Sequence, residues 1–156
     1  MDENRLIGKA GDLPWSKGQK ADLEHYAKTI KGQPVLVGSK TYNPGGIIHT
    51  NASKVYVLTS RDLPVDGKVE LVRSVEEALE IAKNHERFYV LGGGTVYKLM
   101  LPYADEMILT FIKGKFEGDT YFPKWDKSHW RVIAKEDHKA DEYNRYDYSF
   151  VKLARH

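Results

Sequence analysis

The chain contains no cysteine, which excludes disulfide bonds, thiolate nucleophiles and cysteine-ligated metal sites and fits a reducing compartment. It also lacks an excess of either charge, because 24 Lys and Arg stand against 22 Asp and Glu. No basic block stands apart from acidic neighbours, which argues against nucleic-acid binding. No apolar run approaches the roughly 20 residues that span a bilayer, and residues 1–5 lack the apolar stretch of a signal peptide. We therefore expect a cytoplasmic protein with neither membrane nor nucleic-acid partners.

What the sequence does contain is a series of short apolar runs separated by helical patterns. Runs typical of buried strands occupy residues 34–37, 54–58, 69–72, 88–91 and 107–112. Helical spacing covers residues 23–30, residues 75–82 after Ser74 as an N-cap, and residues 95–101. Alternating runs at 130–134 and 146–153 predict an antiparallel hairpin. We expect one α/β domain over residues 1–156, with a mainly parallel mixed sheet, a C-terminal antiparallel hairpin and helices on both faces.

Three predicted strand ends carry glycines or small polar residues suited to an anion. Residues 90–97 form a glycine turn between a strand and a helix, where backbone N–H groups can approach a phosphate. Residues 37–42 repeat the arrangement with one glycine, and residues 58–61 add hydroxyls and a guanidinium. Each alone could be a tight turn or a solvated loop. Together they predict a nucleotide phosphate track, because ligands of open α/β sheets bind at the carboxyl ends of the strands.

One acid, Asp22, falls in the first turn of the first predicted helix, one turn before Tyr26. It is either a helix N-terminal acid favoured by the dipole, or a carboxylate facing an apolar pocket that orients or protonates a nitrogen heterocycle. Upstream, Trp15 ends a Leu-Pro-Trp turn. It is either a core residue or a site residue whose indole N–H needs a hydrogen-bond partner when it is buried. The six histidines are too scattered for a recognisable metal site, so we expect no metal.

These features follow one another in an order that resembles the dihydrofolate reductase family. The resemblance extends from about residue 2 to the C-terminus, and it rests on Leu6-Ile7-Gly8-Lys9, Leu13-Pro14-Trp15, Asp22-Leu23 with Tyr26, Gly38 with Thr41-Tyr42, residues 91–97, Leu109-Thr110, residues 117–120 and Phe122-Pro123. It implies reduction of 7,8-dihydrofolate to tetrahydrofolate with NADPH, in which hydride reaches C6 and a proton reaches N5.

The resemblance also implies a role for each matching residue. Asp22 would bind the pteridine, Trp15 would hold a water beside it, and Thr110 would brace the carboxylate. Residues 8–13 would form a loop that closes over the nicotinamide, and the Gly92–Gly93 bond would be cis. The implied substrate-binding residues are Leu13, Leu23, Tyr26 and Leu91. The implied cofactor-binding residues are Gly8, Ser39, Lys40, Thr41, Thr59, Ser60, Arg61, Gly92, Gly93, Gly94, Thr95, Val96 and Tyr97.

The sequence departs from the family at its start. The family's first strand, which lies near the middle of its sheet, has no counterpart ahead of Asp2. Without a central strand, two rows of backbone groups would stay unpaired. Either residues are missing ahead of Met1, or another segment fills that place. We expect a monomer unless a second chain supplies the strand.

Two arginines common in the family are also replaced. Ser53 stands where an arginine clamps the glutamate tail of folate, so Lys54, Lys31 or His49 would supply a point charge, or the substrate would lack that tail. Ser39 stands where an arginine contacts the cofactor's 2′-phosphate. Neighbouring Lys40 and Arg61 could compensate, which keeps NADPH as the expected cofactor.

Two other functions stay open on the sequence. A related NADPH-dependent reductase of another pterin or a ribosylated pyrimidine would keep the fold, and Ser53 favours it, whereas Asp22 and the Leu-Pro-Trp turn favour dihydrofolate. A catalytically degenerate nucleotide-binding domain is suggested by the missing strand. Turnover of NADPH with dihydrofolate, with and without an antifolate, separates the three.

Overall fold

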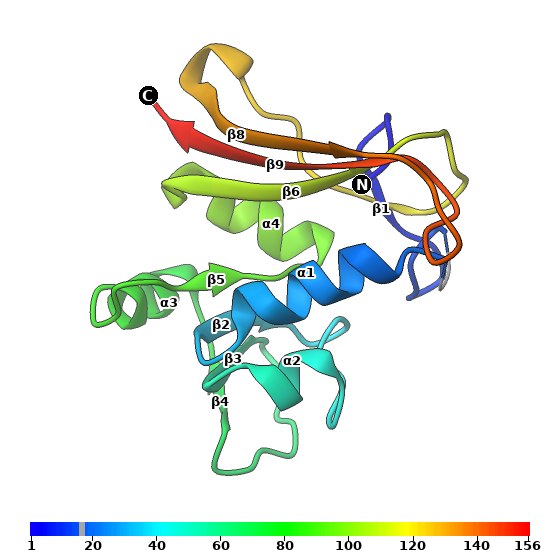
Figure 1. Ribbon diagram of the computed structural model, residues 1–156. Helices are drawn as coiled ribbons and strands as arrows, with labels where there is room; N and C mark the ends of the chain where they lie inside the picture. The colour runs from blue at the N-terminus through cyan, green and yellow to red at the C-terminus, as the bar shows by residue number, and fades with distance from the viewer. Residues whose placement is uncertain (16–17) are drawn as a thin grey trace. The chain divides into compact units, whose positions relative to one another are not determined.

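The computed structural model describes residues 1–15 and 18–156, and the chain divides into two compact units. Unit 1 comprises Met1–Leu23 and Leu101–His156, and unit 2 comprises Glu24–Met100. Helix α1 (Lys20–Ile30) begins in unit 1 and ends in unit 2 (Figure 1). The single domain over residues 1–156 stays a prediction.

Unit 2 contains the parallel sheet that the apolar runs predict. Its strand order is β4-β3-β2-β5, formed by β2 (Pro34–Gly38), β3 (Lys54–Leu58), β4 (Val69–Val72) and β5 (Tyr89–Val90). Strand β5 is shorter than predicted, because it pairs with β2 only at Tyr89 and Val90. All neighbours in this sheet are parallel, so every strand ends at the same edge.

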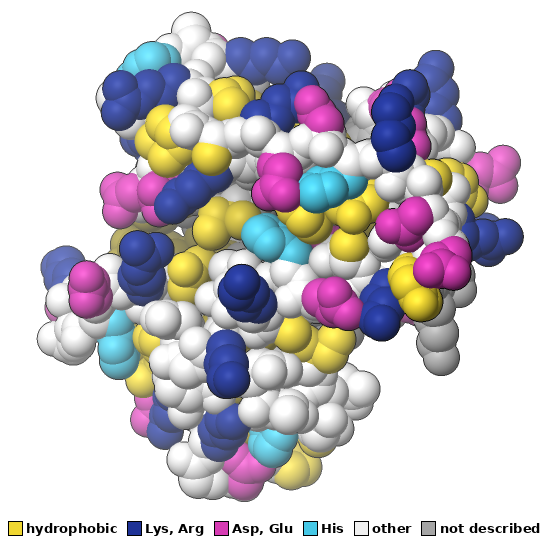
Figure 2. Space-filling view, viewed as in Figure 1, with side chains coloured by type: hydrophobic (Ala, Val, Ile, Leu, Met, Phe, Trp, Pro, Cys, Tyr) yellow, Lys and Arg dark blue, Asp and Glu magenta, His cyan; other side chains and the backbone are white. Residues whose placement is uncertain are grey.

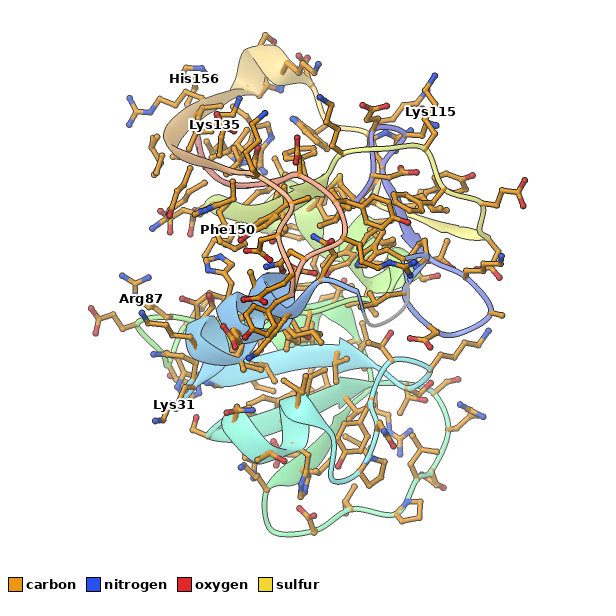
Figure 3. The ribbon with its side chains drawn as sticks, turned by 45° about the vertical axis from the view of Figure 1, so that its right-hand side comes forward. Lys31, Arg87, Lys115, Lys135, Phe150 and His156 are labelled. Atoms are coloured by element: carbon orange, nitrogen blue, oxygen red, sulfur yellow. The ribbon has the colours of Figure 1, made fainter. Side chains whose placement is uncertain are left out.

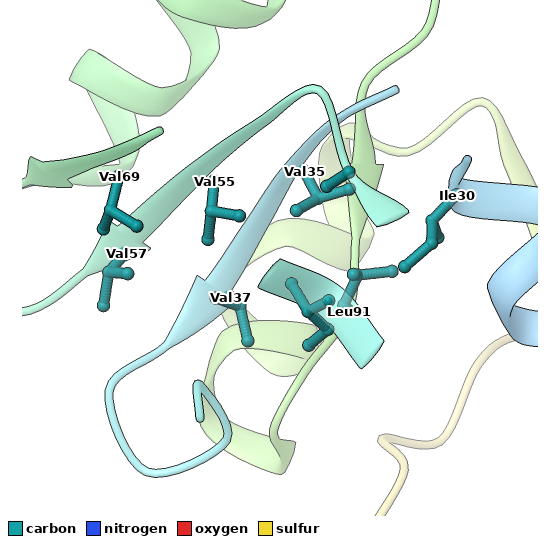
Figure 4. Close-up of a cluster of buried hydrophobic side chains, with 9 residues drawn as sticks. Ile30, Val35, Val37, Val55, Val57, Val69 and Leu91 are labelled. Atoms are coloured by element: carbon teal, nitrogen blue, oxygen red, sulfur yellow. The ribbon is translucent and has the colours of Figure 1, made fainter. Parts of the chain in front are cut away.

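Helices cover both faces of this sheet, as predicted. Val35 and Val37 of β2 point to one face, where they join Ile30 of α1 and Ile48 of α2 (Ile47–Asn51) (Figure 4). Leu36 points to the other face, where residues of α3 (Val75–Ala82) and α4 (Gly94–Met100) cover it. Burying one such side chain contributes about 1.5–3 kcal/mol, so two apolar faces explain the strands' almost continuous hydrophobicity.

The helix boundaries follow local capping chemistry. Ser74 is the N-cap of α3, and its side chain accepts a hydrogen bond from the N–H of Glu77, as the sequence predicts. Helix α2 was not predicted, because its five residues are too few to show a helical period.

Unit 1 is built around an antiparallel sheet of order β6-β9-β8. It consists of β6 (Glu106–Ile112), β8 (Trp130–His138) and β9 (Tyr148–Arg155). The predicted C-terminal hairpin is confirmed by the antiparallel register of β8 and β9. Strands β1 (Leu6–Gly8) and β7 (Thr120–Tyr121) form a second, small sheet. Two 3-10 turns, Leu101–Tyr103 and Lys127–His129, complete the unit.

The core of unit 1 is aromatic. Buried Trp15 packs with Ile112 and Tyr148, and its ring meets Phe116 edge-on with centroids 5.6 Å apart. Phe150 of β9, labelled in Figure 3, packs against the same cluster. These contacts join residues from opposite ends of the chain, so no local pattern could have predicted them.

The edge of β6 away from β9 is paired at one residue. The Met1 α-amine donates to the carbonyl of Thr110 at 2.6 Å, and the N–H of Ile112 donates to the carbonyl of Met1 at 2.8 Å. This is the hydrogen-bond pattern of a parallel pair. Among the described strands none pairs with this edge of β6 or with the second edge of β5. No described strand therefore takes the place of the family's first strand.

The surface agrees with the balanced composition. On the face shown in Figure 2, Lys and Arg side chains are interspersed with Asp and Glu side chains. No helix among the described residues is long and apolar enough to cross a membrane.

Candidate active site

The two glycine junctions of unit 2 meet at the carboxyl edge of its sheet. The N–H of Gly38, at the end of β2, donates to the carbonyl of Gly92, just after β5, at 2.7 Å. Gly92 has a φ of +112° and is followed by a cis peptide bond to Gly93, the isomer that the family resemblance implies. A Cβ on Gly93 would lie 3.0 Å from Thr41 Oγ1. The predicted cofactor residues thus form a backbone cradle with little room for added side chains.

The other predicted cofactor residues lie along the same edge. Arg61 Nη2 donates to Ser39 Oγ at 3.1 Å, and the N–H of Arg61 donates to Thr59 Oγ1 at 3.1 Å. Ser60 and Lys40 are exposed beside them. The hydroxyls and cations that were predicted from separate loops are therefore side by side and accessible to an anion.

Helix α4 continues from the cradle. Gly94 begins the helix, Thr95 is exposed, and Val96 is buried with a Cγ2 atom 3.0 Å from where a Cβ on Gly38 would lie. The ring of Tyr97 lies over Gly92, with Cε2 3.1 Å from that residue's Cβ position.

The predicted acid lies in unit 1. Asp22 is half-buried in the first turn of α1. Its charge acts on the α-amine of Met1, a residue only 8% exposed. Burial lowers the pKa of that amine from 8.0 to about 6, and the charges of Asp22 and Asp2 oppose part of the fall. Since Thr110 accepts from the same amine, this amine connects the predicted acid with the residue predicted to brace it.

Trp15, which precedes Asp22 in the sequence, carries a buried hydrogen-bond donor. The side chain is 5% exposed, and its Nε1 has no hydrogen-bond partner among the described residues. Buried donors in folded proteins are almost always satisfied, by protein or by ordered water. The orphaned indole N–H therefore fits the water that was predicted at this residue.

A remote segment holds the start of α1. The N–H of Ala21 donates to Asn144 Oδ1 at 2.9 Å, so a residue more than a hundred positions away caps the helix. The N–H of Tyr146 donates to Gln19 Oε1 at 2.8 Å. Both amide side chains are buried. The backbone on which Asp22 stands is thus fixed from outside the helix.

The loop predicted to close over the nicotinamide is tied to the residues before β7. Gly8 lies in β1, where its carbonyl accepts from the N–H of Asp119 at 3.0 Å. The N–H of Ala10 donates to Asp119 Oδ2 at 2.9 Å. This bond and that from the Thr120 hydroxyl hold the pKa of Asp119 below its usual value. One carboxylate therefore anchors the loop.

The predicted apolar walls are distributed over both units. Leu13 packs against the aromatic core of unit 1, and Leu23 is half-buried on α1. Tyr26 packs against the buried cluster of unit 2, to which Leu91 belongs.

The side chains that could bind the glutamate tail of folate in place of the missing arginine differ in exposure and in existing partners. Ser53 is exposed just before β3. His49 is bonded to Asp66 at 2.8 Å, and this bond lowers the pKa of Asp66. Lys54 is half-buried, and Lys31 is exposed after α1 (Figure 3).

The structure adds residues that the sequence did not single out. Arg73 bonds to the loop after β3, and its place after a parallel strand was a usable signal. Asn144, Gln19 and the Met1 amine carried no such signal, because only tertiary contacts involve them. No group of three or more metal-ligating side chains occurs among the described residues.

Comparisons with known proteins agree on one family. The family model described as dihydrofolate reductase matches residues 1–155. The chain is 37% identical over 151 residues to the dihydrofolate reductase of Bacillus subtilis, covering 97% of this chain and 88% of that protein. It is 35% identical over 156 residues to dihydrofolate reductase HdrB of Haloferax volcanii, covering 93% and 78%.

A solved structure matches as well. The dihydrofolate reductase of Enterococcus faecalis, complexed with NADP(H) and RAB-propyl, superposes with a TM-score of 0.84 at 32% identity. The match covers 99% of this chain and 92% of that one.

Proposed function

This chain belongs to the dihydrofolate reductase family, and from that premise we propose that it reduces 7,8-dihydrofolate to tetrahydrofolate with NADPH, using Asp22 as the acid of the site. The observation that carries the assignment of Asp22 is its position in unit 1, half-buried at a capped helix start. The family and the neighbour that holds NADP(H) support the reaction and its cofactor.

The residues of unit 2 suit the cofactor's phosphates. The Gly38, Gly92 and Gly93 backbone is packed so closely that a Cβ at any of them meets an atom within 3.1 Å. Such a bare backbone can approach an anion. Thr41 would add a hydroxyl to the pyrophosphate. We assign Ser39, Lys40, Thr59, Ser60 and Arg61 to the phosphate on the adenosine ribose.

Asp22 would bind and polarise the substrate. A bound NADPH supplies the hydride. A carboxylate in a partly desolvated site favours a cation beside it, so Asp22 would hydrogen-bond the 2-amino group and ring nitrogen of the pteridine and stabilise its protonated form. The Trp15 indole would hold the water next to it, and Thr110 would brace the carboxylate.

The loop of residues 8–13 would exclude water and fix the distance between the reacting carbons. Its Ala10 N–H donates to the Asp119 carboxylate, which ties the loop to the residues before β7. Leu13, Leu23, Tyr26 and Leu91 would pack against the rings of the substrate, and Gly94, Thr95, Val96 and Tyr97 would complete the cofactor side.

The test is oxidation of NADPH by the purified chain, followed by its absorbance, with dihydrofolate as acceptor. We expect turnover that requires both compounds and is inhibited by an antifolate. Tight NADPH binding without turnover would instead favour a degenerate nucleotide-binding domain. Comparing the KM for dihydrofolate with that for dihydropteroate measures what the tail contributes, and a large preference for dihydrofolate would show that a cation replaces the arginine absent at Ser53.

We further propose a cytoplasmic monomer whose partners are the small-molecule substrate and cofactor. The cysteine-free composition supports the reducing compartment. Light scattering across a range of concentrations tests the monomer, and a dimer at working concentration would contradict it.

A further inference from the structure

Arg73 stands at the same sheet edge as the proposed phosphate site, but its contacts are made with the protein. It directly follows β4, which ends at Val72. Its Nη1 donates to the carbonyl oxygens of Arg61 at 2.6 Å and Thr59 at 3.2 Å. Its Nη2 pairs with Asp62 Oδ1 at 2.5 Å. One planar guanidinium therefore holds three oxygens of the loop formed by residues 59–62.

The base from which this side chain projects is itself fixed. The N–H of Arg73 donates to Glu77 Oε2 at 2.9 Å, and the N–H of Glu77 donates to Ser74 Oγ, the cap of α3, at 3.1 Å. Thr59 is tied to the end of β4 by its N–H, which donates to the carbonyl of Val72 at 3.0 Å. Helix capping and strand pairing thus fix both sides of the contact before any ligand binds.

The loop held by Arg73 presents Arg61. The side chain of Arg61 is exposed, and its Nη2 reaches Ser39 Oγ at 3.1 Å. Arg73 itself directs its donors at loop oxygens and is paired with Asp62. Both arginines are exposed, and the side chain of Arg73 is 43% accessible. They differ in their contacts: Arg61 reaches the Ser39 hydroxyl, whereas Arg73 bonds to the loop that carries Arg61.

We propose that Arg73 is a positioning residue for cofactor selectivity, which presets Arg61 and Ser39 for the ribose phosphate that distinguishes NADPH from NADH. The inference rests on the proposed function for the assignment of this edge. Its physical basis is preorganisation. Ordering a long side chain and its loop at the moment of binding weakens affinity, and a loop already held avoids that loss.

The first test is the selectivity ratio, kcat/KM with NADPH over kcat/KM with NADH, for Arg73→Met. We expect the ratio to fall about threefold to tenfold through a higher KM for NADPH, because one long side chain must now be ordered on binding. The turnover number with either cofactor and the KM for dihydrofolate should stay at parental values. Arg131→Met, at an exposed arginine of β8, removes the same charge in unit 1 and should leave the ratio unchanged. An unchanged ratio in Arg73→Met would overturn the proposal.

A double-mutant cycle tests whether Arg73 acts through Arg61. Arg61→Met should lower the ratio by about tenfold to a hundredfold, the usual cost of a lost hydrogen bond to a charged group. In that background Arg73→Met should change the ratio by less than about twofold, because the group it positions is gone. The same fall in both backgrounds would mean that Arg73 acts independently and would contradict the inference.

Arg73→Lys separates geometry from charge. Lysine keeps the positive charge but not the planar fork that reaches several oxygens, so its ratio should stay near that of Arg73→Met. Full recovery would show that charge alone suffices and would overturn the positioning role. Dissociation constants for NADPH and NADH, measured by calorimetry, give the same ratio without turnover. A failure of the proposed reaction is thereby distinguished from a failure of this inference.

Discussion

The two units of the chain hold their candidate functional groups in different ways. Unit 2 is one continuous segment, Glu24–Met100, and its cradle is bare backbone at the ends of parallel strands. Unit 1 combines two distant segments, and its groups are single polar atoms placed by long-range contacts such as that of Met1 with Thr110. The comparison implies that unit 1 loses function when one atom is exchanged, whereas unit 2 loses it when atoms are added.

The largest effect should come from exchanging one oxygen of unit 1. Asp22→Asn removes the acid but keeps its shape, so turnover should fall by about two to four decades, the range for a lost acid–base group. NADPH affinity should not change, and the protein should stay folded. Stopped-flow kinetics and NADPH titration measure both, and Asp105→Asn, at an exposed acid of unit 1, serves as the control. A near-parental rate would remove Asp22 from the mechanism.

The next effect concerns the chain that starts at Met1, whose α-amine is buried in unit 1. Its pKa is about 6 in the folded protein against 8.0 for the free group, so the unfolded chain binds more protons between these values. The free energy of unfolding should therefore rise as pH increases from 6 to 8, by about 2–3 kcal/mol over the window.

Urea denaturation at a series of pH values measures this slope. Acetylation of the α-amine removes the titrating group, so the difference between free and acetylated protein isolates its contribution from that of the histidines. Equal slopes in the two forms, or stability that falls over this window, would refute the assignment.

In unit 2 an added methyl group should weaken NADPH binding without any change of charge. Gly92→Ala forces a side chain onto a φ of +112° and places its Cβ 3.1 Å from the Tyr97 ring. We expect NADPH affinity to fall about tenfold, equivalent to about 1.4 kcal/mol, with further loss of stability from the strained backbone. Gly67→Ala is the matched control, because a Cβ there meets no described atom within 4 Å. Equal affinities of the two variants would argue against a tight cradle.

The smallest effect tests the local structure beside the cradle. Ser74→Ala removes the cap of α3 and should lower the free energy of unfolding by about 1 kcal/mol. Denaturant titration measures this, with Ser53→Ala at an exposed serine as the control. If Ser74→Ala leaves stability unchanged, the cap contributes nothing measurable.

Much of unit 2 could be predicted because its signals are local. Buried strands such as β3 show as apolar runs, and Ser74 with Glu77 identifies the start of α3. Gly38 and Gly92 mark strand ends that the parallel topology places at one edge. The position of Arg73 after β4 was a local signal as well, but its contacts could not be predicted, because they depend on how the loop of residues 59–62 folds back.

Unit 1 was less predictable, because its shortest strands and its polar contacts produce no periodic pattern of apolar residues in the sequence. Strands β1 and β7 have too few residues for an alternating pattern. The cap that Asn144 provides for Ala21, and the amine beside Asp22, each join distant parts of the chain. The family motif identified Asp22, but nothing in its neighbourhood predicted what fixes it.

The sequence alone determined the fold class, the order of the main elements and the residue types available for chemistry, since apolar periodicity, caps and glycine turns act over a few neighbouring residues. The tertiary structure alone decided the surroundings of each group: a buried amine beside Asp22 and Thr110, an orphaned indole donor on Trp15, and a guanidinium that holds the Arg61 loop. The reason is physical. Burial, electrostatic environment and hydrogen-bond partners depend on residues that approach only when the whole chain has folded.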